Sequence, residues 1–282
     1  MSSKHPEWIK VRFALNESRL HVNEVMRTKV LHTVCEEAHC PNLGDCWGHG
    51  TATFLLMGDI CTRGCSFCAV MKGRPHPLDP SEPERIAHAV EDLKLQYAVL
   101  TSVDRDDLPD EGAGHFAATV EAVKRRVPSC RVEVLVPDFH ARPELIERLM
   151  ASPFFVFAHN VETVPRLYRR VRPGSDYERS MKVLGLAKGS APGSITKSSL
   201  MLGLGETRSE VLQVFRDLRE RGCDVVTLGQ YLRPTERQVE VFRYVTPAEF
   251  EELRREGEAM GFRKVFSGPL VRSSYHAWEV AT

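Results

Sequence analysis

Three cysteines fall within eight residues of the sequence, in the stretch CTRGCSFC at 61–68. Cys61, Cys65 and Cys68 are separated by three and then two residues. Thiolates are the usual ligands of a 4Fe–4S cluster, one for each iron, so three of them leave one iron without a protein ligand. An open coordination position is where a substrate or cofactor binds in catalytic metal sites. The spacing therefore favours an iron–sulfur cluster that binds a further ligand.

Two other uses of these cysteines are less favoured. Eight cysteines in 282 residues are too few for a disulfide scaffold. Structural zinc sites usually combine C-x2-C with a second Cys or His pair, and no such pair follows Cys68 at close range.

The N-terminal stretch MSSKHPEWIKVRF has no apolar run like that of a signal peptide. We therefore expect a cytoplasmic protein, because a reducing compartment favours metal binding over disulfides.

A second set of cysteines precedes the first, in CEEAHCPNLGDC at 35–46. Cys35, Cys40 and Cys46 have the spacing C-x4-C-x5-C. This set could bind zinc, with a histidine as fourth ligand, or a second iron–sulfur cluster. The cluster is favoured, because the first set already implies that iron and sulfur are loaded onto this chain. The candidate histidines are His32, His39 and His49.

The elements that must position these residues alternate between short apolar runs and longer amphipathic runs. Strands are predicted at 51–57, 97–101, 131–136, 154–158, 197–202 and 224–228. Helices are predicted near 83–95, 113–126, 142–150, 162–170, 176–188, 207–221 and 247–260. Pro83 and Pro143 occupy expected first positions of two helices. Cys130 and Cys223 lie at helix–strand junctions and are expected to be buried structural residues.

Alternation of strand and helix predicts parallel strands joined by crossover helices. Six such units fit a partial (β/α)6 barrel better than a complete eight-unit barrel, and a doubly wound sheet is the alternative. We expect an N-terminal extension at 1–50, the barrel at 51–262 and a C-terminal extension at 263–282. The polar motifs follow the strands, where parallel α/β folds carry their chemistry. These motifs are CTRGCSFC, SVDRDDLPD, PDFHAR, HNVET, GLGET and GQYLRP.

The first cysteine set, directly after the predicted strand TATFLLMGDI, resembles the C-x3-C-x2-C signature of radical S-adenosylmethionine enzymes. The two cysteine sets together, with Arg272-Ser273-Ser274-Tyr275 in GPLVRSSYHA, resemble the lipoyl synthase family. Further stretches support the resemblance across almost the whole chain. They are CPNLGDCW, GTATFLLMGD, TSVDRDDLPD, HNVET, RLYRRVRPGSDYERS, KSSLMLGLGE and LGQYLRPT.

The resemblance implies a fold, a reaction and two kinds of cofactor. The fold is the open six-unit barrel, and the cofactors are two 4Fe–4S clusters and S-adenosylmethionine. Sulfur is inserted at carbons 6 and 8 of an octanoyl chain that is attached to a lysine of a carrier domain. These carbons are unactivated methylenes, so acid–base chemistry cannot remove their hydrogens and a cofactor must supply a radical. In the family, one cluster generates radicals and the other is sacrificed as the sulfur donor.

The resemblance also implies roles for particular residues. Cys61, Cys65 and Cys68 would hold the radical-generating cluster, and Cys35, Cys40 and Cys46 the donor cluster. A serine of RSSY would be the fourth ligand of the donor, and we favour Ser274 over Ser273, although the spacing itself does not choose. An alkoxide is a harder ligand than a thiolate and should leave more easily. By position, the expected contacts to S-adenosylmethionine are Ser102, Asp104, Asn160, Glu162 and Lys197. Arg172 is expected to pair with the carboxylate of the cofactor.

The partners follow from the same resemblance and from the charge. The implied partners are an octanoylated lipoyl carrier domain, an electron donor such as a ferredoxin or flavodoxin, and an iron–sulfur carrier that rebuilds the donor cluster. A formal net charge of zero argues against a nucleic-acid partner, and no apolar run is long enough to span a membrane. The basic run Arg166, Arg169, Arg170 and Arg172 is either a solvated helix face or a patch for an acidic carrier.

Two other functions fit the pattern less well. A two-cluster electron carrier would usually close each cluster with four cysteines, and each set here has three. Radical enzymes that methylthiolate transfer RNA have a larger N-terminal domain and a C-terminal RNA-binding module, for which this chain has neither the length nor the basic charge.

Overall fold

The computed structural model describes residues 5–9, 17–37, 42, 53–274 and 277–281. Cys40, Cys46 and Tyr275 lie outside the described residues, as do residues 51–52 of the first predicted strand. Within the described residues, no helix is long and apolar enough to cross a membrane.

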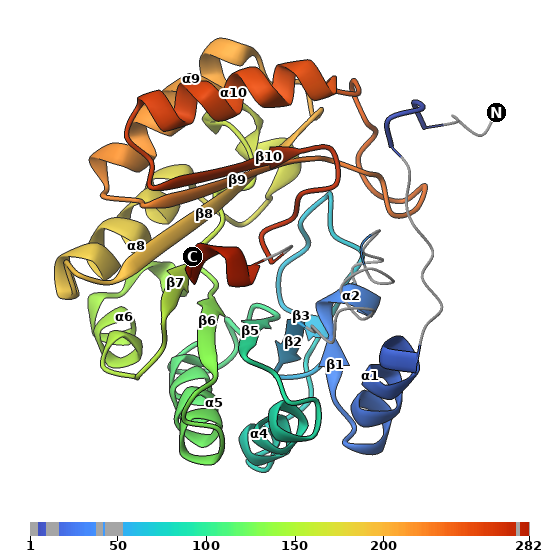
Figure 1. The fold of residues 1–282 in the computed structure, drawn as a ribbon, viewed down its shortest axis with the longest axis vertical. Helices are drawn as coiled ribbons and strands as arrows, with labels where there is room; N and C mark the ends of the chain where they lie inside the picture. Colours follow the sequence, from blue (N-terminus) through green and yellow to red (C-terminus); the bar gives the residue numbers. More distant parts are fainter. Residues whose placement is uncertain (1–4, 10–16, 38–41, 43–52, 275–276, 282) are drawn as a thin grey trace.

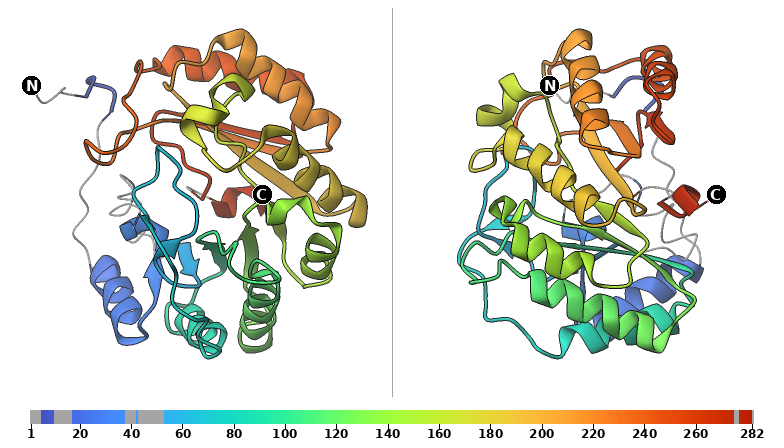
Figure 2. Two further views of the ribbon diagram at one scale, coloured as in Figure 1. Left: turned by 180° about the vertical axis from the view of Figure 1, so that it is seen from behind. Right: turned by 90° about the vertical axis from the view of Figure 1, so that its left-hand side faces the viewer.

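The described residues form one curved sheet with helices on its outer face (Figure 1, Figure 2). The strand order is β1-β2-β5-β6-β7-β8-β9-β10, and pairing is parallel throughout except between β1 and β2. The strands are β1 His32–Thr33, β2 Thr53–Leu56, β5 Tyr97–Ser102, β6 Arg131–Leu135, β7 Val156–Ala158, β8 Ile195–Leu202, β9 Val225–Gln230 and β10 Lys264–Gly268. All six predicted strands are present as adjacent parallel neighbours, so the predicted α/β fold with a mostly parallel sheet is confirmed.

The crossover helices also match the predicted pattern. They are α4 Glu82–Asp92, α5 Ala113–Arg126, α6 Pro143–Met150, α8 Tyr177–Ser190, α9 Arg208–Glu220 and α10 Pro247–Ala259. Thr207 and Thr246 start α9 and α10 with capping boxes, in which the threonine and the glutamate three residues later satisfy each other's backbone amides. Pro143 is the first residue of α6, as predicted, and Pro83 is the second of α4.

The remaining elements lie outside this repeat. They are α1 Glu17–Thr28, α2 Val34–Glu37, α7 Tyr168–Val171, the 3₁₀ turns η1 Phe139–Ala141, η2 Pro165–Leu167 and η3 Ala277–Ala281, and the two-stranded sheet of β3 Ile60–Cys61 and β4 Met71–Lys72. The helix predicted at 162–170 begins later, as η2 followed by α7. Glu162 cannot start it, because its φ of 64° is left-handed and it forms a bridge with Leu200.

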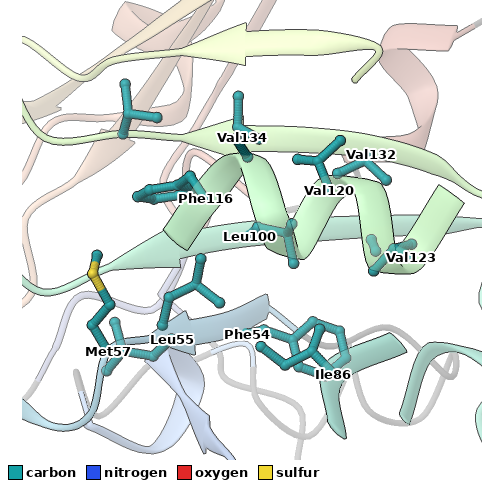
Figure 3. Packing of buried hydrophobic residues seen from close by; sticks show 14 of the residues in the cluster. Phe54, Leu55, Met57, Ile86, Leu100, Phe116, Val120, Val123, Val132 and Val134 are labelled. Atoms are coloured by element: carbon teal, nitrogen blue, oxygen red, sulfur yellow. The ribbon is translucent and has the colours of Figure 1, made fainter. Parts of the chain in front are cut away.

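Strand alternation divides the sheet into an outer and an inner side. Leu100 of β5 and Val134 of β6 pack outward against Phe116 and Val120 of α5 (Figure 3). Their neighbours along each strand consequently face the inside of the curve, since successive side chains point to opposite faces. The inner side therefore holds the polar residues that the next section describes.

Among the elements that the sequence does not predict are α1 and β10. α1 lies in the N-terminal stretch, and β10 extends the parallel sheet within the stretch predicted as the C-terminal extension. β10 is an edge strand in which only Val265 is buried, so its sequence shows no apolar run that would predict it.

Candidate active site

A cavity of about 450 Å³ lies at the carboxyl ends of the parallel strands. Its walls come from the 61–70 loop, from the ends of β5 to β9 and from the segment 271–274. Most of the predicted site residues line it together, although they come from distant parts of the sequence. The predicted residues in its wall are Cys61, Cys65, Cys68, Ser102, Asp104, Asn160, Glu162, Arg172, Ser273 and Ser274.

The cysteine loop is fixed by hydrogen bonds of its backbone, and its three cysteines line the cavity. The Gly73 amide donates to the Cys61 carbonyl at 3.0 Å, and the Ser66 amide donates to the Val171 carbonyl at 2.9 Å. The Cys61 sulfur accepts backbone amides of Arg63 and Asp104, at 3.4 and 3.3 Å. Amide donors of this kind stabilise a thiolate, which is the form that binds metal.

Arg63 links this loop to two neighbouring strands, and its role was not anticipated from the sequence. Its guanidinium donates to both oxygens of Asp106, at 2.8 and 2.6 Å, and to both oxygens of Asp138, at 2.8 and 2.9 Å. Asp138 also accepts the His140 amide at 3.1 Å, within a turn where three consecutive non-glycine residues have positive φ. Such bidentate pairs have a defined geometry, so Arg63 fixes the orientation of the loop between two ligands.

Burial keeps the cysteine thiols protonated when no cation is near. It raises the pKa of Cys61 to about 12, with the Asp104 carboxylate as the next contributor. It also raises the pKa of Cys65 to about 11, although Arg172 opposes this, and it raises the pKa of Cys68. Three thiolates are therefore stable here only when a positive charge compensates them, as bound iron does.

The residues after β7 form a second cluster around Arg172. Arg172 is only 9% exposed, and its Nη1 donates to the Asn160 carbonyl at 2.9 Å. The Asn160 amide donates to Glu162 at 3.0 Å. Burial raises the pKa of Glu162, and the positive charge of Arg172 counteracts it.

Several polar atoms in this wall are buried without a hydrogen-bond partner among the described residues. They are Ser102 Oγ, His159 Nε2, Asn160 Oδ1 and Arg172 Nε. A buried polar group without a partner is costly, so such a group in a cavity wall points to a bound ligand. His159 was not singled out from the sequence. Burial lowers its pKa to about 4, so it is neutral, and its Nδ1 lies 2.9 Å from the Val136 carbonyl, which leaves Nε2 as an acceptor.

Lys197, which the sequence predicts to contact the cofactor, is not among the residues that line the cavity. It is the third residue of β8, near the amino end of the strand. Its ammonium group is fully buried and lies 2.9 and 3.1 Å from the two carboxylate oxygens of Glu133, which also accepts the Tyr97 hydroxyl at 2.8 Å. Lys197 therefore satisfies a buried carboxylate inside the sheet.

The two extensions meet beside the cavity. Asn42, between Cys40 and Cys46 in the sequence, donates from its side chain to the Leu270 carbonyl at 2.6 Å. Val34, the neighbour of buried Cys35, is part of the cavity wall, as are Ser273 and Ser274. This arrangement brings Val34 and Asn42 close to the segment that carries both serines and does not choose between Ser273 and Ser274.

The predicted basic run is divided between the surface and the interior. Arg166 is exposed and paired with Glu210 at 2.7 Å, and Arg170 donates to the Leu204 carbonyl. Arg172 turns into the cavity wall. The run is therefore not a single face for a partner.

Comparisons with known proteins agree with this geometry. A family model described as "Radical SAM superfamily" matches residues 55–218. The chain has the fold of methylornithine synthase, with a TM-score of 0.59 at 16% identity over 75% of this chain and 62% of that one. It also resembles SuiB of Streptococcus suis bound to S-adenosylmethionine, with a TM-score of 0.55 at 15% identity over 78% of this chain and 50% of that one. The chain is thus a member of the radical S-adenosylmethionine superfamily.

Sequence relatives narrow the assignment. The chain is 54% identical to the lipoyl synthase of Methylococcus capsulatus over 97% of this chain and 85% of that protein. It is 54% identical to the lipoyl synthase of Roseiflexus sp. over 98% of this chain and 91% of that protein, and 52% identical to that of Haemophilus influenzae over 97% and 86%. Within the superfamily, the chain belongs to the lipoyl synthase family.

The cofactors of this family are 4Fe–4S clusters and S-adenosylmethionine, and the described residues fit them. Three thiols meet in one wall of the cavity, and unpartnered polar atoms meet in the wall formed after β5 and β7. A metal centre with an open coordination position would bind to the thiols. A ligand that carries amino, carboxylate and hydroxyl groups would form hydrogen bonds with the polar atoms.

The position of Lys197 predicts an effect on stability. In Lys197→Met the Glu133 carboxylate stays buried without its cation, and we expect the free energy of unfolding of the apoprotein to fall by about 3–5 kcal/mol. Chemical denaturation measures this change, and adding Glu133→Gln should restore much of it. Loss of S-adenosylmethionine binding with an unchanged free energy of unfolding would instead indicate that Lys197 contacts the cofactor.

The raised thiol pKa values predict a pH dependence. In the folded apoprotein, alkylation of Cys61 should keep rising with pH towards about 12, because only the thiolate reacts. The same cysteine in the denatured chain should titrate near its ordinary value of about 8.5. Mass spectrometry of iodoacetamide-treated samples gives both curves, and a folded-state midpoint at or below the denatured one would contradict the effect of burial.

Proposed function

We propose that the chain converts a protein-bound octanoyl-lysine to a lipoyl group by inserting sulfur at carbons 6 and 8 in this cavity. The observation that carries the proposal is the meeting of three thiols, a set of unpartnered polar atoms and a serine-bearing tail in one cavity. When bound, one cluster with S-adenosylmethionine supplies the radical that takes hydrogen from an unactivated methylene, and the other cluster supplies sulfur.

Cys61, Cys65 and Cys68 are the proposed ligands of the radical-generating cluster. Arg63 positions the loop that carries them through its bonds to Asp106 and Asp138. The Cys61 sulfur accepts two backbone amides, which stabilises its thiolate as iron binds. The Gln238 side chain donates to the Cys68 carbonyl at 3.0 Å and fixes the end of the loop.

S-adenosylmethionine is proposed to bind between this loop and the ends of β5 and β7. The charge of Arg172 suits the cofactor carboxylate, and its Nε is free for a further bond. Glu162 and Asn160 offer acceptors for the amino group or the ribose hydroxyls. Ser102 Oγ lies in the same wall with no partner among the described residues.

The donor cluster is proposed to bind to Cys35, Cys40, Cys46 and one serine of RSSY, with Ser274 favoured. Two observations support this assignment. Both serines line the cavity, and the hydrogen bond from Asn42 to Leu270 joins the second cysteine region to the tail that carries them. An alkoxide ligand suits a cluster that must lose iron during the reaction.

The proposed substrate is an octanoyl-lysine on a lipoyl carrier domain. Phe67, Met201 and Leu232 are apolar parts of the cavity wall and suit an acyl chain.

The proposal also includes a ferredoxin or flavodoxin as reductant, an iron–sulfur carrier that rebuilds the donor cluster, and a cytoplasmic location. Anaerobic reaction with an octanoylated carrier peptide tests the function directly, because mass spectrometry should detect a product with two added sulfur atoms. A peptide mass that stays unchanged in spite of cofactor cleavage would refute it.

Replacement of the first cysteine set should stop radical formation. In Cys61→Ala, Cys65→Ala or Cys68→Ala we expect formation of 5′-deoxyadenosine to be abolished, because the cluster would lack a ligand. Iron per chain should fall from about eight to about four in each variant, if two four-iron clusters are present. Chromatography of the quenched reaction measures the nucleoside, and its retention in any variant would refute this assignment.

Replacement of Ser274 should stop sulfur transfer while radical formation continues. We expect Ser274→Ala to form 5′-deoxyadenosine but no thiolated peptide, because the radical-generating cluster keeps its three thiolates. Ser273→Ala is the matched control and should be milder. Normal product from Ser274→Ala with inactive Ser273→Ala would identify Ser273 as the ligand. Full activity in both variants would contradict a serine ligand altogether.

A further inference from the structure

The chain beyond the two serines returns to the inside of the sheet. Ala277 is buried against Tyr97 and Val99, the first and third residues of β5. Val280 is 2% exposed and packs against Val156, Ile195 and Val225. In Figure 1 this dark red turn, η3, lies within the curve of the strands.

These contacts place η3 at the end of the sheet opposite the cavity. Val156, Ile195 and Val225 are the first residues of β7, β8 and β9. The ammonium group of Lys264, the first residue of β10, donates to the Glu279 carbonyl at 2.6 Å. The C-terminal segment therefore begins at the carboxyl ends of the strands and finishes at their amino ends.

The chain before the serines is held as well. The Gln230 amide donates to the Pro269 carbonyl at 3.2 Å, and Asn42 donates to the next carbonyl, that of Leu270. The approach to β9 is so close that a Cβ on Gly229 would lie 1.9 Å from the Val271 carbonyl oxygen. The tail at 269–271 thus lies directly on the backbone of β9.

The two attachments together restrict where the serines can lie. Ser274 is three residues from Val271 and three residues from Ala277. A fully extended chain covers roughly 3.6 Å per residue, so Ser274 stays within about 11 Å of both points. A tail attached at only one end would explore a larger volume and would present its hydroxyl at a lower effective concentration.

We propose that η3 is a positioning anchor that holds the serine ligand at the donor cluster. It acts through the tail and touches neither cluster nor substrate. The proposal rests on the donor-site assignment above and extends it to residues 277–281, for which neither the sequence patterns nor the comparisons suggest a role. Burial of Ala277 and Val280 holds η3 in place, and the attached tail then keeps the serine at the fourth ligand position of the donor cluster.

The test uses two variants of the full enzyme, Val280→Asp and a chain that ends at residue 276. Each should release the anchor, the first because a carboxylate would be buried among valines and isoleucine. We expect 5′-deoxyadenosine formation to persist, while thiolated product per nucleoside falls on the order of tenfold, as the effective concentration of the serine falls. The matched control is Val30→Asp, at a valine that is 72% exposed, and it should leave this ratio unchanged.

A spectroscopic measurement gives a readout that does not depend on activity. In a background that carries Cys61→Ala, Cys65→Ala and Cys68→Ala, only the donor cluster assembles, and its Mössbauer spectrum reports its ligands. We expect Val280→Asp to change this spectrum towards that of Ser274→Ala, and Val30→Asp to leave it unchanged.

The outcomes are distinct. If η3 only supports the sheet, the melting temperature falls, both products decline in parallel, and the spectrum of the donor cluster is unaffected, which overturns the proposal. If Ser274→Ala and Ser273→Ala are both fully coupled, the serine assignment itself fails. If Ser274→Ala forms 5′-deoxyadenosine without thiolated product while both anchor variants form both products, the donor-site assignment is supported and the anchor proposal is refuted.

Discussion

Arg63 lies between Cys61 and Cys65 in the sequence and donates hydrogen bonds to Asp106 after β5 and to Asp138 after β6. One guanidinium therefore joins three segments that are far apart in the sequence. Because the pairs are bidentate, they fix the orientation of the loop as well as its position. Arg63 is 8% exposed, so competition from water and screening by salt are weak. This ion-pair network thus helps to hold the loop that carries the cysteines against the ends of β5 and β6.

The acidic surroundings of Arg63 also affect the charge of the thiols. Asp104, Asp106 and Asp138 surround Arg63, and Asp104 is also close to Cys61. Burial and the Asp104 carboxylate raise the pKa of all three thiols, so the pocket without metal disfavours negative sulfur. Binding of a metal centre by these thiols would therefore release protons.

The sequence was a good guide to the sheet and a partial guide to the site. Parallel strands are buried on both faces and give apolar runs, so β5 and β9 were predicted within two residues of their ends. β10 was missed, because an edge strand with one buried residue has no such run. Position after a strand was enough to place Asn160 and Glu162 in the cavity wall, whereas Arg172 was expected there because of its charge.

The misplaced and missed residues depend on information that a linear sequence does not contain. Lys197 was assigned to the cofactor because it lies on the correct strand, but the distance along the strand determines which end of the barrel it faces. Arg63 and His159 were not anticipated, because their partners are Asp138 and the Val136 carbonyl, which only the fold brings near. Which serine is the ligand is not decided by spacing or by the fold, since both line the cavity.

The hydrogen bond between Asn42 and Leu270 has a consequence for the order of folding. Its partners are 228 positions apart, so closing that loop costs more entropy than any contact between adjacent strands. Such a contact forms late, after the neighbouring strands have paired. During synthesis, Asn42 can bond to Leu270 only after nearly the whole chain has left the ribosome. The region proposed for the donor cluster is therefore the last to mature, and iron and sulfur delivered to a nascent chain would find only the first cysteine set in place.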